Sequence, residues 1–340
     1  MTGQPFVYVG GDDDTIGVYR LDPATAALTL AHTVRAGRHP SFLAVGRSKK
    51  FLYTVNEFSA EVAAFALDAK TGDLTLVNRV ASQGNEPAYA SVHGSEKFVF
   101  VANYAGGTVA VFPIRADGSL GAPSDVRRTG SNPHSILTDP SHRFVFVANK
   151  GSDTISQFSF DETRGALVPN EPPEVATPKG AEPRHIAFHP HRAFAYVIEE
   201  AGSRVETYAF DAARGLLSSL GSISTLPEGV DGATNTGADL HFSPTGKFLY
   251  GSNRGHDTIV ICAVGDDGRP KLVGHQSTQG KTPRNFGIDS TGRFLFAANQ
   301  DSGTLVTFAI DAERGTLDRI RTTTLRTSPY WVGVITLAGD

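Results

Sequence analysis

The sequence predicts an all-β fold, a seven-bladed β-propeller that forms one domain over residues 1–340. Three observations predict it: one unit recurs at intervals of 46 to 54 residues, each unit holds four strand-like runs, and one unit is divided between the two chain ends. A chain of this length would otherwise suggest two domains, but repeat folds grow by adding units to a single body.

The recurring unit begins at a proline, passes through an apolar strand and a polar turn, and ends its second strand at an asparagine. The interval between the two is 16 residues in every copy. The copies are Pro40–Asn56, Pro87–Asn103, Pro133–Asn149, Pro183–Glu199, Gly237–Asn253 and Pro283–Asn299, and a last Pro329 begins a seventh. We expect the asparagine side chains to cap the turns that follow them, because Asn satisfies local backbone groups.

Each unit is expected to form one blade of four antiparallel strands. In the third copy the runs are Ser135–Thr138, Phe144–Ala148, Thr154–Phe160 and a shorter one near Val168. Val, Ile, Phe and Tyr are frequent in these runs, and polar turns separate them. A β-helix is the alternative architecture, but its repeats are usually shorter than these units.

The seventh unit is incomplete at the C-terminus, because only Tyr330–Leu337 follows its proline. The N-terminal segment contains three runs that match the remaining strands, at Phe6–Gly10, Ile16–Leu21 and Leu28–Val34. We therefore expect the C-terminal strand to join the N-terminal blade. This pairing would close the ring and leave no open sheet edge.

Composition narrows the possible functions. The formal net charge of −4 argues against a nucleic-acid partner, and no apolar run is long enough to predict a membrane span. Cys262 is the only cysteine, and the first residues lack the pattern of a signal peptide, so we expect a cytoplasmic protein without disulfides. The sequence contains no Gly-rich phosphate loop, HExxH motif or GxSxG elbow, and we expect no metal and no cofactor.

The 16-residue interval also predicts where a site would lie. Both ends of each inner hairpin should reach one face of the disc, so the residues after each proline and each asparagine should surround the mouth of the central channel. Charged residues and histidines from the third to sixth units meet there in this prediction: His134, Lys150, Arg184, His185, Glu200, Asp239, His241, Arg254 and Arg284. Asn285, Gln300, Tyr104 and Trp331 occupy neighbouring positions.

Such a cluster of cations in an acidic protein predicts a small anionic substrate, because buried cations are costly unless an anion neutralises them. Arg binds carboxylate or phosphate through its planar fork. Glu200 or a neutral histidine would take a proton from water, and an Arg or a protonated histidine would stabilise an oxyanion. The structural alternatives are that Arg184 only pairs with Glu200 and that Trp331 only packs the closing strand. His189 and His191, in an outer turn, are expected to be exposed to solvent.

Four segments resemble the propeller-type lactonase family, whose best-known members are bacterial 6-phosphogluconolactonases and fungal carboxy-cis,cis-muconate cyclases. They are Gly180–Pro190, Ala238–Pro244, Pro283–Phe286 and Pro329–Val332. The resemblance spans the chain and implies His134, Arg184, Glu200 and Arg254 as the central set. Lys150, His185, Asp239, His241 and Arg284 match family positions around that set. One departure is Glu199, which replaces the asparagine of its unit.

The resulting hypothesis is hydrolysis of a sugar lactone, 6-phospho-D-glucono-1,5-lactone, to the open acid. The alternatives are a muconate-type lactonising cycloisomerase and a propeller that binds ligand without catalysis. In the hydrolytic hypothesis Glu200 or His185 is the base and His134 contacts the ring oxygen. The catalytic group is His134, Arg184, Glu200, Arg254 and His185. The expected substrate-binding residues are Lys150, Asp239, His241, Arg284, Asn285, Gln300, Tyr104 and Trp331.

Overall fold

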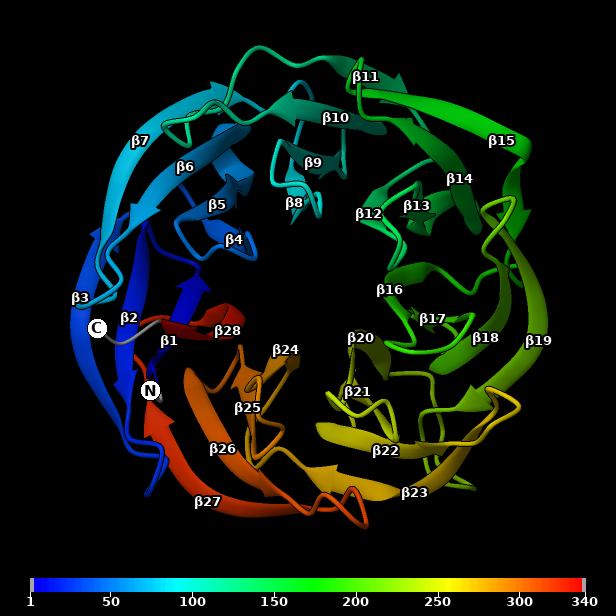
Figure 1. Cartoon of the computed structure of the whole chain (residues 1–340). Coiled ribbons are helices and arrows are strands. Elements are labelled where there is room, and N and C mark those ends of the chain that lie inside the picture. The colour runs from blue at the N-terminus through cyan, green and yellow to red at the C-terminus, as the bar shows by residue number, and fades with distance from the viewer. Residues whose placement is uncertain (1–2, 338–340) are drawn as a thin grey trace.

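Seven four-stranded antiparallel sheets surround a central axis in the computed structural model, which describes residues 3–337 (Figure 1). The predicted propeller and its strands are confirmed. In each blade the strand that follows the repeat proline lies innermost, and the later strands lie progressively further from the axis. No helix within this described stretch is long and apolar enough to cross a membrane.

The strands of the first four blades follow the chain in order. The first blade holds β4 (Pro40–Val45), β5 (Phe51–Asn56), β6 (Glu61–Leu67) and β7 (Leu74–Ala81). The second holds β8 (Pro87–Val92), β9 (Phe98–Asn103), β10 (Thr108–Pro113) and β11 (Asp125–Arg128). The third holds β12 (Pro133–Thr138), β13 (Phe144–Asn149), β14 (Thr154–Asp161) and β15 (Ala166–Ala176). The fourth holds β16 (Pro183–Phe188), β17 (Phe194–Glu199), β18 (Arg204–Asp211) and β19 (Leu216–Ser224).

The remaining blades complete the ring. The fifth holds β20 (Thr236–Phe242), β21 (Phe248–Arg254), β22 (Thr258–Val264) and β23 (Pro270–Ser277). The sixth holds β24 (Pro283–Ile288), β25 (Phe294–Asn299), β26 (Thr304–Ile310) and β27 (Leu317–Thr324). The seventh holds β28 (Pro329–Leu337), β1 (Gln4–Gly11), β2 (Thr15–Leu21) and β3 (Leu28–Arg35). Two short 3₁₀ helices, η1 (Glu57–Ser59) and η2 (Lys150–Ser152), follow β5 and β13.

The seventh blade is the predicted closure between the chain ends. Its innermost strand, β28, pairs with β1 along the whole length of β1, from Gln4 opposite Leu337 to Gly11 opposite Pro329. Phe6 of β1 is fully buried, and Ile335 and Leu337 of β28 belong to the same core. The first and last strands of the described chain are therefore held by a sheet ladder and by packing.

Adjacent blades are joined by apolar clusters and by hydrogen bonds that buried tyrosine hydroxyls donate from one blade to the next. The Tyr53 hydroxyl donates to the Gly118 carbonyl in the next blade at 3.2 Å, and Tyr196 donates likewise to Gly268 at 2.6 Å. Gly118 and Gly268 have φ of 83° and 75°, a conformation that favours glycine. Each bond ties the second strand of one blade to the outer turn of the next.

A β-bulge near the start of each inner strand determines which side chains face the axis. In β16 the register shifts between Pro183 and His185, so Arg184 is an extra residue. The same shift follows the first paired residue in β4, β8, β12 and β24, and in β20 it lies between Gly237 and Leu240. A bulge lets two successive residues oppose one on the partner strand and re-aims their side chains.

Two smaller expectations need correction. The repeat asparagines are structural, but no side-chain cap bond forms at η1 or η2. Instead Asn56 donates to the Ala36 carbonyl at 3.1 Å, which ties it to the connection from the preceding blade. His189 is 2% exposed, not solvent-exposed as expected, because its ring packs against Phe242 with 5.1 Å between centroids. His191 is exposed as expected.

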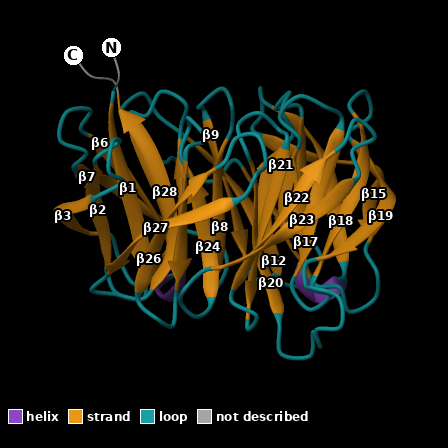
Figure 2. Cartoon of the chain, turned by 90° about the horizontal axis from the view of Figure 1, so that it is seen from below, coloured by secondary structure: helices purple, strands orange, loops and turns teal. Residues whose placement is uncertain are grey.

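The two faces of the disc differ. Both 3₁₀ helices lie on one face, and the start of β1 and the end of β28 lie together on the other (Figure 2). Since η2 begins with Lys150, the predicted site belongs to the face opposite the start of β1.

Candidate functional site

A cup of converging side chains lies at the channel mouth on the face with η1 and η2. Its enclosed part is a hollow of about 10 Å³. The hollow is lined by bulge residues and the residues that follow them: Ser41, Phe42, Ala88, His134, Arg184, His185, Arg284, Asn285 and Tyr330. A space of this size holds about one water molecule. The bulges therefore gather side chains of six blades around one small volume.

Glu200 is the electrostatic centre of the cup. Its Oε1 lies 2.9 Å from Lys150 Nζ, and its Oε2 lies 3.1 Å from both Arg184 Nε and Arg254 Nη2. Burial opposes ionisation, but these three cations outweigh it and lower the pKa of Glu200 to about 2. Glu200 is therefore an ionised carboxylate at neutral pH and a very weak base.

Arg184 is held in place on several sides. Its Nη1 donates to the Ala238 carbonyl of the next blade and lies 3.3 Å from His185 Nε2. The side chain is 3% exposed. Burial and the nearby charge of Arg254 lower the pKa of Arg184 to about 9, so the guanidinium remains charged at neutral pH. Its direction is set before any substrate arrives.

His134 is a buried histidine in the wall of the cup. It is 7% exposed, its buried Nδ1 has no hydrogen-bond partner, and its ring lies 5.3 Å from that of His185 and 5.7 Å from that of Tyr104. Burial, and then the charge of Arg184, hold the pKa of His134 well below its ordinary value. The imidazole is consequently neutral and can accept a proton.

Arg284 differs from the other cations of the cup. Its guanidinium lies over the Tyr330 ring, 4.6 Å from the centroid. Within residues 3–337 it has no carboxylate at ion-pair distance, whereas Lys150, Arg184 and Arg254 all pair with Glu200. Burial and the charge of Arg254 lower the pKa of Arg284. Arg284 is thus a cation whose charge is not balanced by direct pairing.

Asp239 and His241 lie beneath the cup, and Asn285, at the hollow, bonds to Asp239 from above. Asp239, 2% exposed, accepts from His185 Nδ1 at 2.7 Å and from His241 Nε2 at 2.9 Å. It also accepts from the Asn285 amide and from the backbone N–H groups of Leu240 and Phe286. The acceptor positions of Asp239 are therefore used by groups of the protein itself. Asn285 alone of these three lines the hollow.

The other predicted residues differ in their surroundings. The Tyr104 hydroxyl is 3.5 Å from Lys150 Nζ. Trp331 packs against the core between the seventh and first blades and meets the Phe42 ring edge-on at 6.1 Å. Gln300 donates to Asp301 at 3.1 Å, while its Oε1 is buried without a partner.

Some site residues were not selected from the sequence. Ser41, Phe42, Ala88 and Tyr330 line the hollow, and they occupy the same post-proline positions as the selected residues. Glu182 lies 3.2 Å from Lys150 Nζ. Their position after the repeat proline could have identified Ser41, Phe42, Ala88 and Tyr330. A choice of residues by charge or by a histidine ring does not include them.

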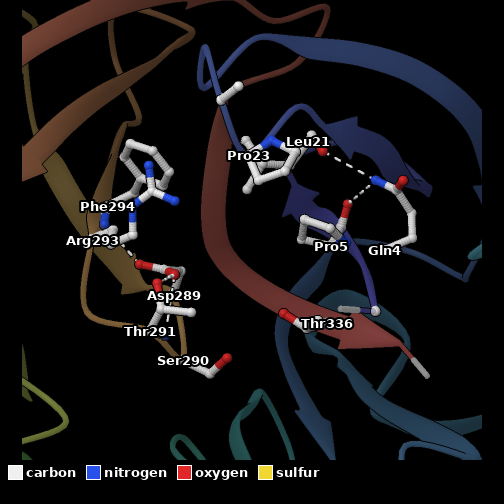
Figure 3. Close-up of a pocket in the computed structure, with 12 residues that line it drawn as sticks. Gln4, Pro5, Leu21, Pro23, Asp289, Ser290, Thr291, Arg293, Phe294 and Thr336 are labelled. Carbon is white, nitrogen blue, oxygen red and sulfur yellow. Dashed lines mark hydrogen bonds between the residues drawn. The ribbon is translucent and has the colours of Figure 1, made fainter. Parts of the chain in front are cut away.

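A larger hollow of about 910 Å³ lies elsewhere, between the sixth and seventh blades (Figure 3). Its one lining carboxylate, Asp289, accepts from the backbone N–H of Phe294 at 2.7 Å and of Thr291 at 3.1 Å. Gln4 donates to the carbonyls of Pro5 and Leu21. These polar groups are used to hold turns and strand ends, so size alone does not mark this hollow as the site.

Proteins with sequences similar to this chain include two that are named 6-phosphogluconolactonase. A 6-phosphogluconolactonase of Bacillus subtilis strain 168 is 32% identical over 328 residues, which cover 93% of each chain. A 6-phosphogluconolactonase of Formosa agariphila is 51% identical over 86 residues, only 24% of each chain.

Solved structures of similar fold include a gluconolactonase. The periplasmic gluconolactonase of Pseudomonas aeruginosa superposes with a TM-score of 0.92 at 28% identity, over 98% of this chain and 100% of that one. A protein from Lactobacillus plantarum superposes with a TM-score of 0.90 at 28% identity, over 98% and 99% of the two chains. The family model for lactonases with a seven-bladed β-propeller matches residues 6–334. The chain therefore belongs to the lactonase family of seven-bladed β-propellers.

Proposed function

We propose that this lactonase hydrolyses 6-phospho-D-glucono-1,5-lactone to 6-phosphogluconate. The observation that carries the choice of a phosphorylated substrate is the charge of the cup. Lys150, Arg184, Arg254 and Arg284 bring four positive charges to the cup, whereas two carboxylates, Glu200 and Glu182, pair with cations there. The surplus positive charge suits a dianionic phosphate. The B. subtilis relative, named for the phosphorylated lactone, supports the same choice.

His134 is the general base in this proposal. It removes a proton from a water as the water oxygen bonds to the lactone carbonyl carbon, and the carbonyl becomes an oxyanion. Arg184 and Arg254 stabilise that oxyanion. When the intermediate collapses, the bond to the ring oxygen breaks and His134 returns its proton to that oxygen. The product acid then ionises and releases one proton to solvent.

In this proposal Glu200 orients the cations of the cup and is not the general base. With a pKa of about 2 it is too weak a base to take a proton from water at neutral pH. Its carboxylate instead holds Arg184, Arg254 and Lys150 in a fixed arrangement, so the oxyanion meets donors that need no reorganisation.

The small hollow suits the attacking water. At about 10 Å³ it accommodates one water, while a sugar ring would lie above it in the open part of the cup. His134 and Arg184 both line this hollow, which would place water between the base and the cation. Arg284, which has no carboxylate at ion-pair distance within residues 3–337, then remains available for the phosphate.

The test is a side-by-side assay of phosphorylated and unphosphorylated glucono-1,5-lactone with the purified protein, corrected for spontaneous hydrolysis. We expect kcat/KM for the phosphorylated lactone to be at least about tenfold higher, the value of one charged contact. Equal or reversed values would contradict the phosphorylated substrate. A rate no higher than that of buffer for both would contradict lactone hydrolysis, and loss of diene absorbance with carboxymuconate would point to the cycloisomerase.

A further inference from the structure

The central channel is divided by an aromatic floor directly beneath the cup. The floor consists of Phe42, Tyr89 and His185, the residues that follow the bulges in their strands. The rings of Phe42 and Tyr89 stack at 4.0 Å, and their centroids lie 5.9 Å and 5.3 Å from that of His185. Phe42 and His185 line the hollow of the cup and also a second cavity of about 340 Å³.

This second cavity, the lower chamber, extends from the floor to the turns on the opposite face. Its walls include Leu137, Phe188, Leu240 and Phe242, and its far end reaches Pro190 and Pro244. Most of these side chains are apolar. The polar side chains among its lining residues include His185, Asp239 and His241, of which His241 is the most exposed, at 44% of its side chain.

A chain of polar contacts crosses the floor. On the side of the cup, Arg184 Nη1 lies 3.3 Å from His185 Nε2. On the other side, His185 Nδ1 lies 2.7 Å from Asp239 Oδ1, and Asp239 Oδ2 lies 2.9 Å from His241 Nε2. His241 in the lower chamber is thus linked through two side chains to the Arg184 guanidinium in the cup.

The protonation states along this chain are mutually consistent. Burial opposes ionisation of Asp239, but His241 and His185 hold its pKa well below the ordinary value. Burial and Arg184 lower the pKa of His185 to about 4, so this ring is neutral. An ionised Asp239 accepts the proton on Nδ1, which leaves the lone pair of Nε2 toward the Arg184 donor.

We propose that Asp239 and His241 are positioning residues that act through His185 on Arg184, and that the charge of His241, below the floor, tunes the cup above it. The functional part of this inference rests on lactone hydrolysis in the cup. While His241 is protonated, it neutralises Asp239. When it loses its proton, Asp239 becomes an unbalanced negative charge beneath Arg184, and stabilisation of the oxyanion weakens.

The sign of the pH effect follows from the contacts of His241. Burial opposes its protonated form, but Asp239 outweighs burial and raises the pKa of His241 above its ordinary value. Asp239 is the one carboxylate at ion-pair distance from His241 within residues 3–337. The other titratable groups on strands packed against β20 are Arg184, His185, Tyr196, Glu199, Tyr250, Arg254 and Arg284. Activity should therefore fall as the pH rises through the pKa of His241.

The first experiment compares the pH profile of lactone hydrolysis for the wild type, His241→Gln, His241→Lys and the control His191→Gln. His241 is suitable because its partly exposed side chain can change without filling the core. We expect His241→Gln to lower kcat about fivefold at pH 6, the effect of one partly screened charge, with little change in KM. The deficit should disappear at high pH, and His241→Lys should restore activity and remove the basic limb.

The second experiment does not depend on turnover. Nitrogen-15 NMR of the histidine rings should find the His185 proton on Nδ1 in the wild type, and the pKa of His241 should match the basic limb of kcat. If the His185 proton is on Nε2, or if His241→Gln keeps the wild-type profile, the proposal is overturned. If the wild type hydrolyses no lactone but the NMR result holds, the proposed function fails and the assigned contacts stand.

Discussion

Arg184 and Glu200 form a buried ion pair across one inner hairpin, with 3.1 Å between Nε and Oε2. The sequence predicts this pairing across the hairpin as a structural alternative to a functional role for Arg184. In the structure the Glu200 carboxylate also contacts Lys150 and Arg254. Glu182 also pairs with Lys150, so with Arg284 four cations face two carboxylates and the cup is positive overall. The ion pair is therefore part of the site as well as part of the fold.

Removing the shared carboxylate should destabilise the protein. We expect Glu200→Gln to lower the free energy of unfolding by about 3 kcal/mol at pH 7, because the cations lose their common partner. Since the pKa of Glu200 is lowered from 4.5 to about 2, its stabilisation is present above pH 4.5 and is lost as the pH falls toward 2.

Chemical denaturation of the wild type and Glu200→Gln between pH 2 and pH 8 measures this difference. The two curves should converge at the acid end. Inorganic phosphate should stabilise the variant more than the wild type, because an added anion replaces the missing charge. Parallel curves at all pH values would contradict the assignment.

Glu199, which replaces the asparagine of its unit, should destabilise the protein at alkaline pH. Burial, and then Glu206, raise the pKa of Glu199 from 4.5 to about 7. The folded state thus binds this proton more tightly than the unfolded state, and stability falls as the pH rises from about 4.5 to 7. We expect Glu199→Asn to raise the free energy of unfolding at pH 8 by about 3 kcal/mol, with little gain at pH 4.5.

Thermal unfolding of wild type and Glu199→Asn at pH 4.5 and pH 8 tests this expectation, with Glu313→Asn as a control at an exposed turn. An equal gain at both pH values would indicate improved packing instead of relief of a buried charge.

Replacing the proposed base should reduce catalysis without removing binding. We expect His134→Gln to lower kcat about 10²- to 10⁴-fold, with KM changed less than kcat. Because the pKa of His134 lies well below 6.5, kcat of the wild type should show no acid limb near that pH. Steady-state assays from pH 5 to pH 8 provide both readouts, and an acid limb centred near pH 6.5 would assign the base to a different group.

Arg284 should determine the preference for a phosphorylated substrate. We expect Arg284→Met to raise KM for the phosphorylated lactone about ten- to a hundredfold, as for loss of a charged hydrogen bond. KM for the unphosphorylated lactone should change little. Arg321→Met, at an exposed position of β27, is the matched control. An equal loss with both lactones would place Arg284 at the reacting carbonyl.

The repeat made most of the fold predictable. The 16-residue interval, as in Pro183 to Glu199, fixed each inner hairpin, and the unmatched β28 implied closure with β1. Convergence of the cup residues followed from this geometry. The depth at which each side chain is buried could not be predicted in the same way. It depends on the bulge after each proline, and no particular residue type indicates that bulge.

The contacts between side chains within the site could not be predicted from the sequence either. Asp239 and Arg254 are both charged residues near a channel mouth in the sequence pattern. In the structure Asp239 lies under the floor with every acceptor position used, while Arg254 contacts Glu200 in the cup. Burial and hydrogen-bond partners separate their roles, and both depend on three-dimensional packing.

The pairing of Gln4 with Leu337 places the two ends of the described chain side by side on the face opposite the cup. A fusion partner, surface tether or affinity handle attached at either end would therefore leave the cup unobstructed. The same adjacency would let a short linker join the ends, so that the ring could be reopened between two other blades and still assemble.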